Sequence, residues 1–235
     1  MIRALVRMRL AAFVRTGRAL PPLLAGLVIL GVIHGGGKAQ AGEAYGFSAV
    51  ALFPVLAWQV KLVLDTEPDV QRRLALATVG PRREITAGLL AATVAGAATV
   101  AFAMVVPWLV GALAIGGIEG PGKPGDLPLA TGIALGLWAH VAALTAAVGL
   151  GALASRPVTR SALNGVAVLA TGSVLAIVLG LRGSVAPWLV PPLMAAARDL
   201  AGRPDGPGVA ALSAQAVTWT AAVVAIYLRL RRTRS

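Results

Sequence analysis

Six long stretches of the chain carry no charged side chain and consist largely of Ala, Val, Leu and Gly. Each approaches or exceeds the ~20 apolar residues that a membrane-spanning helix requires. The third stretch, Ile85 to Ile118, is too long for one span and too short for two, so we expect one helix that is interrupted near Pro107 and ends in an external loop. The pattern predicts six transmembrane helices, at about residues 19–34, 45–64, 85–111, 128–153, 161–181 and 207–228.

A dense group of charged residues separates the second and third predicted spans. Nine charged residues lie between Lys61 and Glu84, although charged residues make up only 13% of the chain. Thr66 followed by Asp69 resembles a capping box, and Gly80 followed by proline is a typical stop signal. Acidic residues near the start also favour a helix there. We expect a cytoplasmic helix over residues 66–79, with Arg72 on one face and an apolar opposite face that consists of Val70, Leu74 and Ala77.

Residues 1–18 are expected to form a helix that lies on the membrane rather than across it. On a helical wheel, four of the five arginines in this segment share one third of the circle, and Arg9 is the exception. This is typical of a basic amphipathic helix in the cytoplasmic interface. A plain basic flank that only sets the topology is the alternative. The four clustered arginines are Arg3, Arg7, Arg15 and Arg18.

The segment between the last two predicted spans, residues 185–202, has helix signals of its own. Pro191 and Pro192 are suited to a helix start, Gly202 is suited to an end, and Trp188 is suited to the membrane interface. We expect an external helical hairpin here, and an irregular loop is the alternative.

The composition supports a membrane protein. Hydrophobic residues make up 57% of the chain and the mean hydropathy is +0.81. Only 13% of residues are charged, whereas soluble domains carry roughly 25%. We therefore expect one all-α integral membrane domain over residues 1–235, with no room for a soluble catalytic domain.

The placement of charge sets the expected orientation. With six spans both termini lie on one side, and that side carries sixteen of the 21 Lys and Arg residues. The positive-inside rule places it in the cytoplasm. We expect a multi-pass protein of the cell membrane with both termini cytoplasmic. The formal net charge of +12 is then explained by topology, and nucleic acid is not expected as a partner.

The sequence carries no recognisable catalytic motif. It has no HExxH or GxSxG motif and no cysteine, so no zinc-protease site, serine nucleophile or thiolate metal site is expected. The run GVIHGGGKAQ lacks the Gly and the Ser or Thr that a phosphate loop needs. We expect no ATP site, metal or cofactor in this chain, and we do not expect it to be an enzyme.

Two features inside the fourth predicted span each have two interpretations. His140 is the sole candidate for a proton relay within the membrane, but a lone histidine in a bundle is more often hydrogen-bonded structure. Gly132 and Gly136 form a GxxxG pair, which indicates either close packing between helices of the chain or a contact between two copies.

The order of these segments resembles the membrane subunit of an ABC type-2 transporter from end to end. The closest local likeness is LALATVGPRREITAGLLAA, Leu74 to Ala92, where small and apolar residues, a proline and basic residues precede a glycine that enters the third span. The family's Glu-Arg-Glu-x-Gly-like run appears here as Asp65 to Arg73, without the glycine.

The resemblance implies an ATP-driven exporter. Residues 66–79 would be the coupling helix that docks into one of two cytoplasmic ATPase subunits, which would hold the ATP and Mg²⁺. A second membrane subunit, either the same chain or a paralogue, would complete the transporter in the bilayer. The docking candidates are Thr66, Glu67, Asp69, Val70, Arg72, Arg73, Leu74 and Ala77.

The family's transport path is lined mainly by the first, second and fifth spans. A largely apolar lining would suit export of a hydrophobic or amphipathic compound, such as an antibiotic, a peptide or a lipid. By position, the lining candidates in this chain are Phe53, Trp58, Gln59, Asn164, Thr171 and Ser173.

Two other functions fit the sequence less fully. An integral-membrane scaffold or regulatory subunit without a transport path would need only small-residue packing and few polar groups in the membrane. A secondary transporter would depend on His140 as its ionisable group.

Overall fold

The structure is a computed structural model that describes residues 1–114, 128–202 and 208–234. The loop expected after the third span falls on residues 115–127 and lies outside these ranges. Within them the regular secondary structure is helical, apart from one isolated bridge between Ala39 and Leu113. The elements are α1 (Ile2–Arg15), α2 (Leu20–His34), α3 (Ala41–Leu64), α4 (Asp69–Val79), α5 (Pro81–Leu109), α6 (Leu129–Leu153), α7 (Arg156–Thr159), α8 (Ala162–Val178), the 3₁₀ turn η1 (Pro187–Leu189), α9 (Leu193–Leu200) and α10 (Gly208–Arg234).

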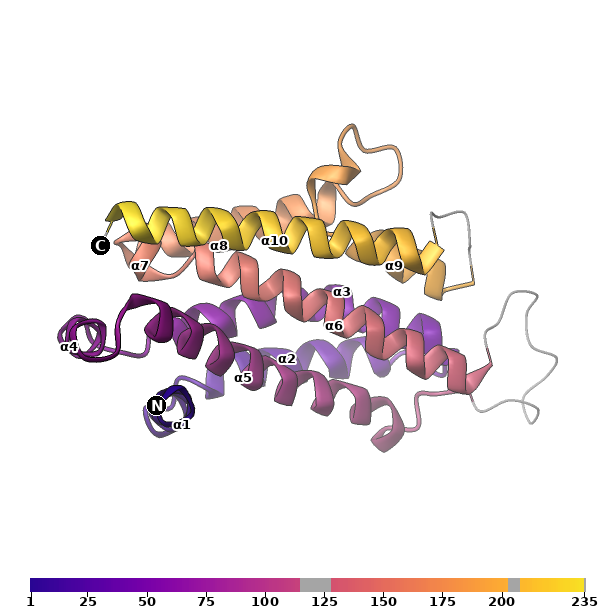
Figure 1. The fold of residues 1–235 in the computed structure, drawn as a ribbon. Coiled ribbons are helices and arrows are strands. Elements are labelled where there is room, and N and C mark those ends of the chain that lie inside the picture. Colours follow the sequence, from indigo (N-terminus) through magenta and orange to yellow (C-terminus); the bar gives the residue numbers. More distant parts are fainter. Residues whose placement is uncertain (115–127, 203–207, 235) are drawn as a thin grey trace.

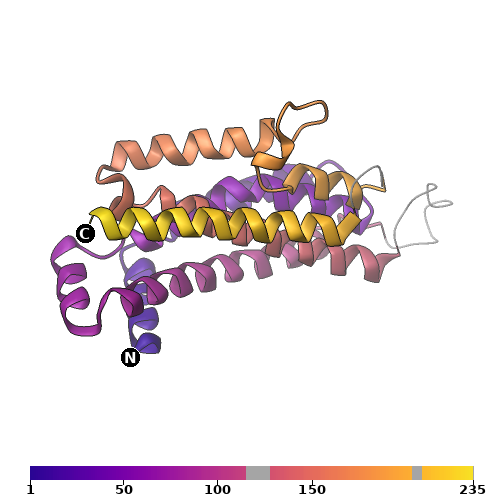
Figure 2. The same ribbon diagram turned by 45° about the horizontal axis from the view of Figure 1, so that its top comes forward.

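The long helices lie side by side in one bundle, and α1 lies across one end of it (Figure 1). The chain bends by 73° between α1 and α2. Both termini and α4 lie at this end, which we call the α4 end (Figures 1 and 2). The connection between α2 and α3 lies at the opposite end together with α9, and we call this the α9 end.

Several helices are long and apolar enough to cross a membrane. In the described part of the chain these are α3, α5, α6 together with α7, and α10, and the bent pair of α1 and α2 would count as a fifth. α8 is also apolar but has only 17 residues. The prediction of an all-α protein with several membrane-spanning helices is confirmed at this level, and the number six stays a prediction.

α3 is the central helix of the bundle, and α6 packs closely along it. Gly132, Gly136 and Gly151 of α6 lie where a side chain would meet α3. A Cβ at Gly151 would come within 2.5 Å of the Ala57 carbonyl oxygen, and one at Gly136 would overlap the Tyr45 side chain. The glycine pair of the predicted fourth span is therefore used for packing inside the chain, which was one of its two interpretations.

Two details of the expected helices are wrong. α5 is not interrupted at Pro107 but continues to Leu109, because a proline so near the C-terminal end removes only one hydrogen bond from the last turns. The expected capping box at Thr66 is also absent. The Thr66 hydroxyl donates to the Leu62 carbonyl instead, and α4 begins at Asp69 with Pro68 as its N-cap.

The segment before α10 contains short helical elements, as expected for residues 185–202. α9 begins after Pro192 and ends before Gly202, the positions that the sequence indicates. Its inner face is buried against α3, where Gly46 allows close approach, because a Cβ there would lie 3.1 Å from the Ala197 Cα. α9 therefore covers the bundle at the α9 end.

The close contact between α3 and α6 yields a stability prediction. Gly136→Ala should lower the free energy of unfolding by about 1–3 kcal/mol, because the added methyl group overlaps Tyr45. Thermal unfolding in mild detergent measures the change. The control is Gly31→Ala in α2, where a Cβ meets nothing within 4 Å. It should be neutral or stabilising, since alanine is the better helix former. Equal effects of the two substitutions would contradict the packing role.

Candidate functional site

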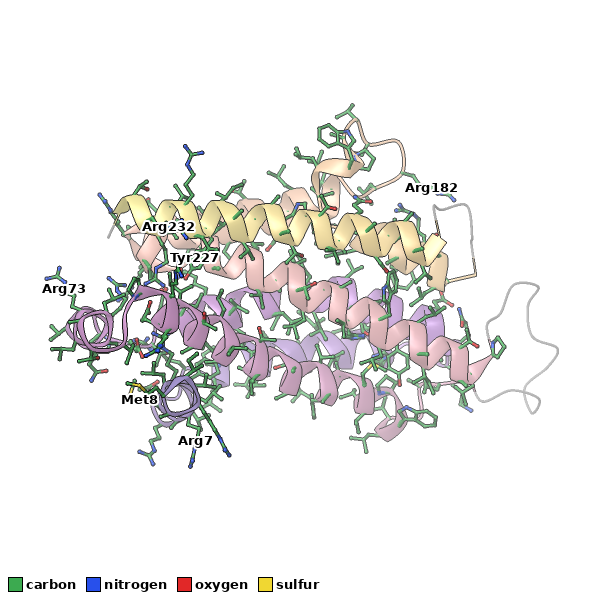
Figure 3. All side chains as sticks on the ribbon, viewed as in Figure 1. Arg7, Met8, Arg73, Arg182, Tyr227 and Arg232 are labelled. Carbon is green, nitrogen blue, oxygen red and sulfur yellow. The ribbon has the colours of Figure 1, made fainter. Side chains whose placement is uncertain are left out.

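α4 is a short charged helix that stands clear of the apolar bundle (Figure 1). The face predicted to be apolar is open to solvent, with Val70 70% exposed and Leu74 61% exposed. Ala77 is exposed on the same face, and Arg73 points away from the bundle (Figure 3). Exposed apolar side chains on a projecting helix are a feature of surfaces that bind another protein.

The other predicted docking residues have different surroundings. Thr66 and Glu67 precede α4 and are enclosed at its base, and Arg72 is half-buried. The side chain of Asp69 lies outside the described part. Val70, Arg73, Leu74 and Ala77 are thus exposed on α4, whereas Thr66 and Glu67 are enclosed at its base.

A buried ion network at the α4 end joins the segment that precedes α4 to three helices. Both Nε and Nη2 of Arg9 on α1 donate to the Glu67 carboxylate, at 2.7 and 2.6 Å. Arg9 Nη2 also lies 2.7 Å from Oε1 of Glu84, near the start of α5. The second oxygen of Glu84 accepts from Arg231 of α10 at 2.8 Å. All four side chains are less than 10% exposed.

The network contains two arginines and two glutamates, so it has no net charge, and each charged side chain contacts one of opposite sign. Burial by itself lowers the pKa of Arg9, but the hydrogen bonds and charges of Glu67 and Glu84 raise it, and the net pKa is raised. Arg231 also donates to the Tyr227 hydroxyl at 3.0 Å, and Tyr227 lies on the inner face of α10 (Figure 3). This arrangement holds two arginines and two glutamates in a place almost free of water.

A second buried pair fixes the chain just before α4. Lys61 Nζ, on the last turn of α3, lies 2.7 Å from the Asp65 carboxylate. The other carboxylate oxygen of Asp65 accepts from the Arg156 backbone N–H at 2.7 Å, and its backbone carbonyl accepts from Arg18. Asp65 therefore ties the end of α3 to the start of α7 and to the segment that joins α1 to α2.

Sequence reasoning did not find this network. Arg9, Glu84 and Arg231 were not among the predicted site residues. The one available signal was that Arg9 departs from the basic face of α1. It departs because it points into the bundle, whereas Arg7 points away from it (Figure 3).

Neither of the two cavities described below brings the predicted path residues together. Phe53 is fully buried in the core of α3, and Trp58 is half-buried. On α8, Asn164 and Thr171 are exposed, whereas Ser173 is buried and its hydroxyl has no hydrogen-bond partner.

Gln59, one of the predicted path residues, lines a cavity. The cavity has a volume of about 510 Å³ and lies between α1, α2, α3 and α5. Its walls are apolar apart from Gln59 and Thr99, which are hydrogen bonded to each other at 2.9 Å. Gln59 also donates to the Ala95 carbonyl at 3.2 Å. The amide therefore ties α3 to α5 as well as facing the cavity.

His140 is fully buried, and both of its ring nitrogens have partners. Nδ1 lies 2.8 Å from the Gly136 carbonyl, to which it must donate, and Nε2 lies 3.3 Å from the Ser48 hydroxyl. These bonds favour the structural interpretation of His140 over a proton relay.

The ion network yields a second stability prediction. Glu84→Gln keeps the shape of the side chain but removes the charge shared by Arg9 and Arg231, so the free energy of unfolding should fall by about 3–5 kcal/mol. Glu43→Gln is the matched control, because Glu43 is half-buried and outside the network. It should change stability by no more than about 0.5 kcal/mol. Thermal unfolding in detergent compares the two, and similar values would show that the network is not stabilising.

Comparison with known proteins gives no match to a family model, a curated protein or a solved structure. What the chain does must therefore be inferred from its own residues. The two features that bear on function are the exposed face of α4 and the buried charges that anchor it.

Proposed function

We propose that this chain is the membrane-spanning permease subunit of an ABC type-2 transporter, which exports a hydrophobic or amphipathic compound. A separate cytoplasmic ATPase, present in two copies, binds ATP and Mg²⁺ and supplies the energy. The observation that carries the proposal is α4, a charged helix with exposed apolar residues that projects from an apolar bundle.

The surroundings of α4 suit the transmission of force. An isolated helix of 11 residues is marginally stable in water, so α4 depends on its attachment to α3 and α5. Glu67 at its base is held by Arg9, which also holds Glu84 of α5. A partner that moves α4 would therefore act on α1, α5 and α10 together.

The proposal assigns six spans to α2, α3, α5, α6, α8 and α10. α1 lies in the cytoplasmic interface, and α9 belongs to the external hairpin. α2 has 15 residues and rises about 22 Å. This is short of a hydrocarbon core of roughly 30 Å, and local thinning of the bilayer can accommodate the difference. Both termini and α4 lie in the cytoplasm, where the basic residues are concentrated.

A second membrane subunit would cover the outer face of α8. This face is apolar and open, with Leu163, Val166 and Val174 among its exposed residues. Lipid would cover the same side chains in a monomer. The same chain or a paralogue could supply the second subunit, because either could present a matching apolar face.

The assignment of α4 is tested by partner capture. The tagged chain is purified in mild detergent from its native host, and stoichiometric partners are identified by mass spectrometry. A P-loop ATPase should co-purify with it. The double substitution Val70→Asp with Leu74→Asp should abolish the interaction while leaving membrane insertion intact, because it charges the exposed apolar face.

The matched control places the same two charges on a neighbouring face of α4. Gln71 and Thr78 are exposed and lie seven residues apart, so Gln71→Asp with Thr78→Asp adds equal charge beside the apolar face. This variant should retain the ATPase better than the first one does. Recovery of the chain without any ATPase would favour a scaffold or regulatory subunit.

The orientation is tested separately with single cysteines, since the chain has none of its own. Val185→Cys lies at a 93% exposed position beyond α8, and Leu74→Cys lies on α4. A membrane-impermeant maleimide should label the first in intact cells and the second only after permeabilisation. Labelling of both from the same side would contradict the six-span topology.

A further inference from the structure

A second cavity lies at the α9 end, far from α4. Its volume is about 530 Å³, within the usual range for small-molecule sites of roughly 300–1,000 Å³. It is formed by the end of α2, the first half of α3 and the last turn of α8. Gly37 and Ala39, which precede α3, and Ala112, which follows α5, complete its lining. Its apolar walls include Ile33, Phe47, Val50 and Ile177.

Two ionisable side chains line this otherwise apolar cavity. Glu43 lies in the first turn of α3, and His34 is the last residue of α2. His34 is only 6% exposed, and its Nε2 has no hydrogen-bond partner. A buried polar atom without a partner costs free energy, so it normally has a reason to be retained.

Glu43 also lacks a partner in the described part of the chain. No residue there forms an ion pair or a side-chain hydrogen bond with its carboxylate. The buried carboxylates of the α4 end differ, since Asp65, Glu67 and Glu84 each contact a Lys or Arg side chain. Lys38 lies nearby in the sequence, but it is exposed and does not line the cavity.

These surroundings select the chemistry of a ligand. An anion would be repelled by Glu43, and an uncharged apolar molecule would cover the carboxylate without compensating it. A metal ion would need more ligands, and no group of three His, Cys, Asp or Glu side chains occurs in the described residues. A cation with an apolar body would pair with Glu43 through its charge and cover the apolar walls of the cavity with its body. Phe47 lines the cavity and is 43% exposed, so an aromatic side chain is available to such a cation.

We propose that this cavity binds an amphipathic cation, such as a hydrophobic amine or a quaternary onium compound, with Glu43 as its counter-ion. That the cavity lies on the export route rests on the proposed function, under which α2, α3 and α8 are the first, second and fifth spans.

The test uses the purified chain in lipid nanodiscs and tetraphenylphosphonium as the probe. Equilibrium dialysis should show saturable binding of this cation. Tetraphenylborate has the same shape and the opposite charge, and it should bind at least about tenfold more weakly. Glu43→Gln should weaken binding of the cation about tenfold or more, because it removes the counter-ion. Phe47→Ala should weaken it several-fold by removing an aromatic wall.

Two controls exclude effects of folding and of the other cavity, and the probe taken up by empty nanodiscs is subtracted for each ion to remove partition into lipid. The thermal stability of each variant is measured beside its binding. Leu27→Trp fills the other cavity, which α1 and α5 help to form, and should leave binding of the cation unchanged. Binding that does not saturate, equal binding of the anion, or unchanged binding by Glu43→Gln would each overturn the proposal.

The outcome can be separated from that of the proposed function. Cation binding that depends on Glu43, in a chain that captures no ATPase through α4, would support the cation site and refute the transporter assignment. ATPase capture without cation binding would support the permease and refute this cavity as its cation site.

Discussion

The buried contact among Arg9, Glu67, Glu84 and Arg231 is the interaction on which the α4 end depends. Hydrophobic burial brings helices together but has no direction, so it cannot set where a charged helix leaves an apolar bundle. Charged hydrogen bonds are directional, and the two-pronged contact of Arg9 with Glu67 sets the base of α4 relative to α1. The charges are stable in this place because each has a partner of opposite sign.

The rest of the bundle is organised around α3. Glycines of α6 bring two helices close together, and the short side chains along α5 do the same on another side. α8 and α10 contribute less buried surface and leave apolar faces open. In a bilayer such faces contact lipid or another subunit, so the chain has a compact core and an outer layer suited to further contacts.

Charged side chains have different surroundings at the two ends of the bundle. At the α4 end, two ion clusters anchor the segments around α4, and the exposed apolar residues stand outside them. At the α9 end, Glu43 and His34 line a cavity without partners for their polar atoms. Paired buried charges hold structure in place, whereas a half-buried carboxylate without an ion pair leaves interaction free energy for a ligand. In the proposed function α4 transmits force, and in the further proposal the second cavity binds a cation.

The sequence by itself determined the features that depend on local composition. Long apolar runs predict helices that are long enough to cross a membrane, and the charged segment after residue 61 predicts α4. Both predictions are possible because hydropathy and helix signals depend only on residues within a few turns of each other. Only the tertiary structure decided the partners of individual side chains. Arg9 meets residues 58 and 75 positions away, and Glu84 meets one 147 positions away, so no local pattern reveals these pairs. For the same reason no local pattern reveals that Gln59 bonds Thr99 of α5, or that His34 and Glu43 line one cavity where α2 ends and α3 begins.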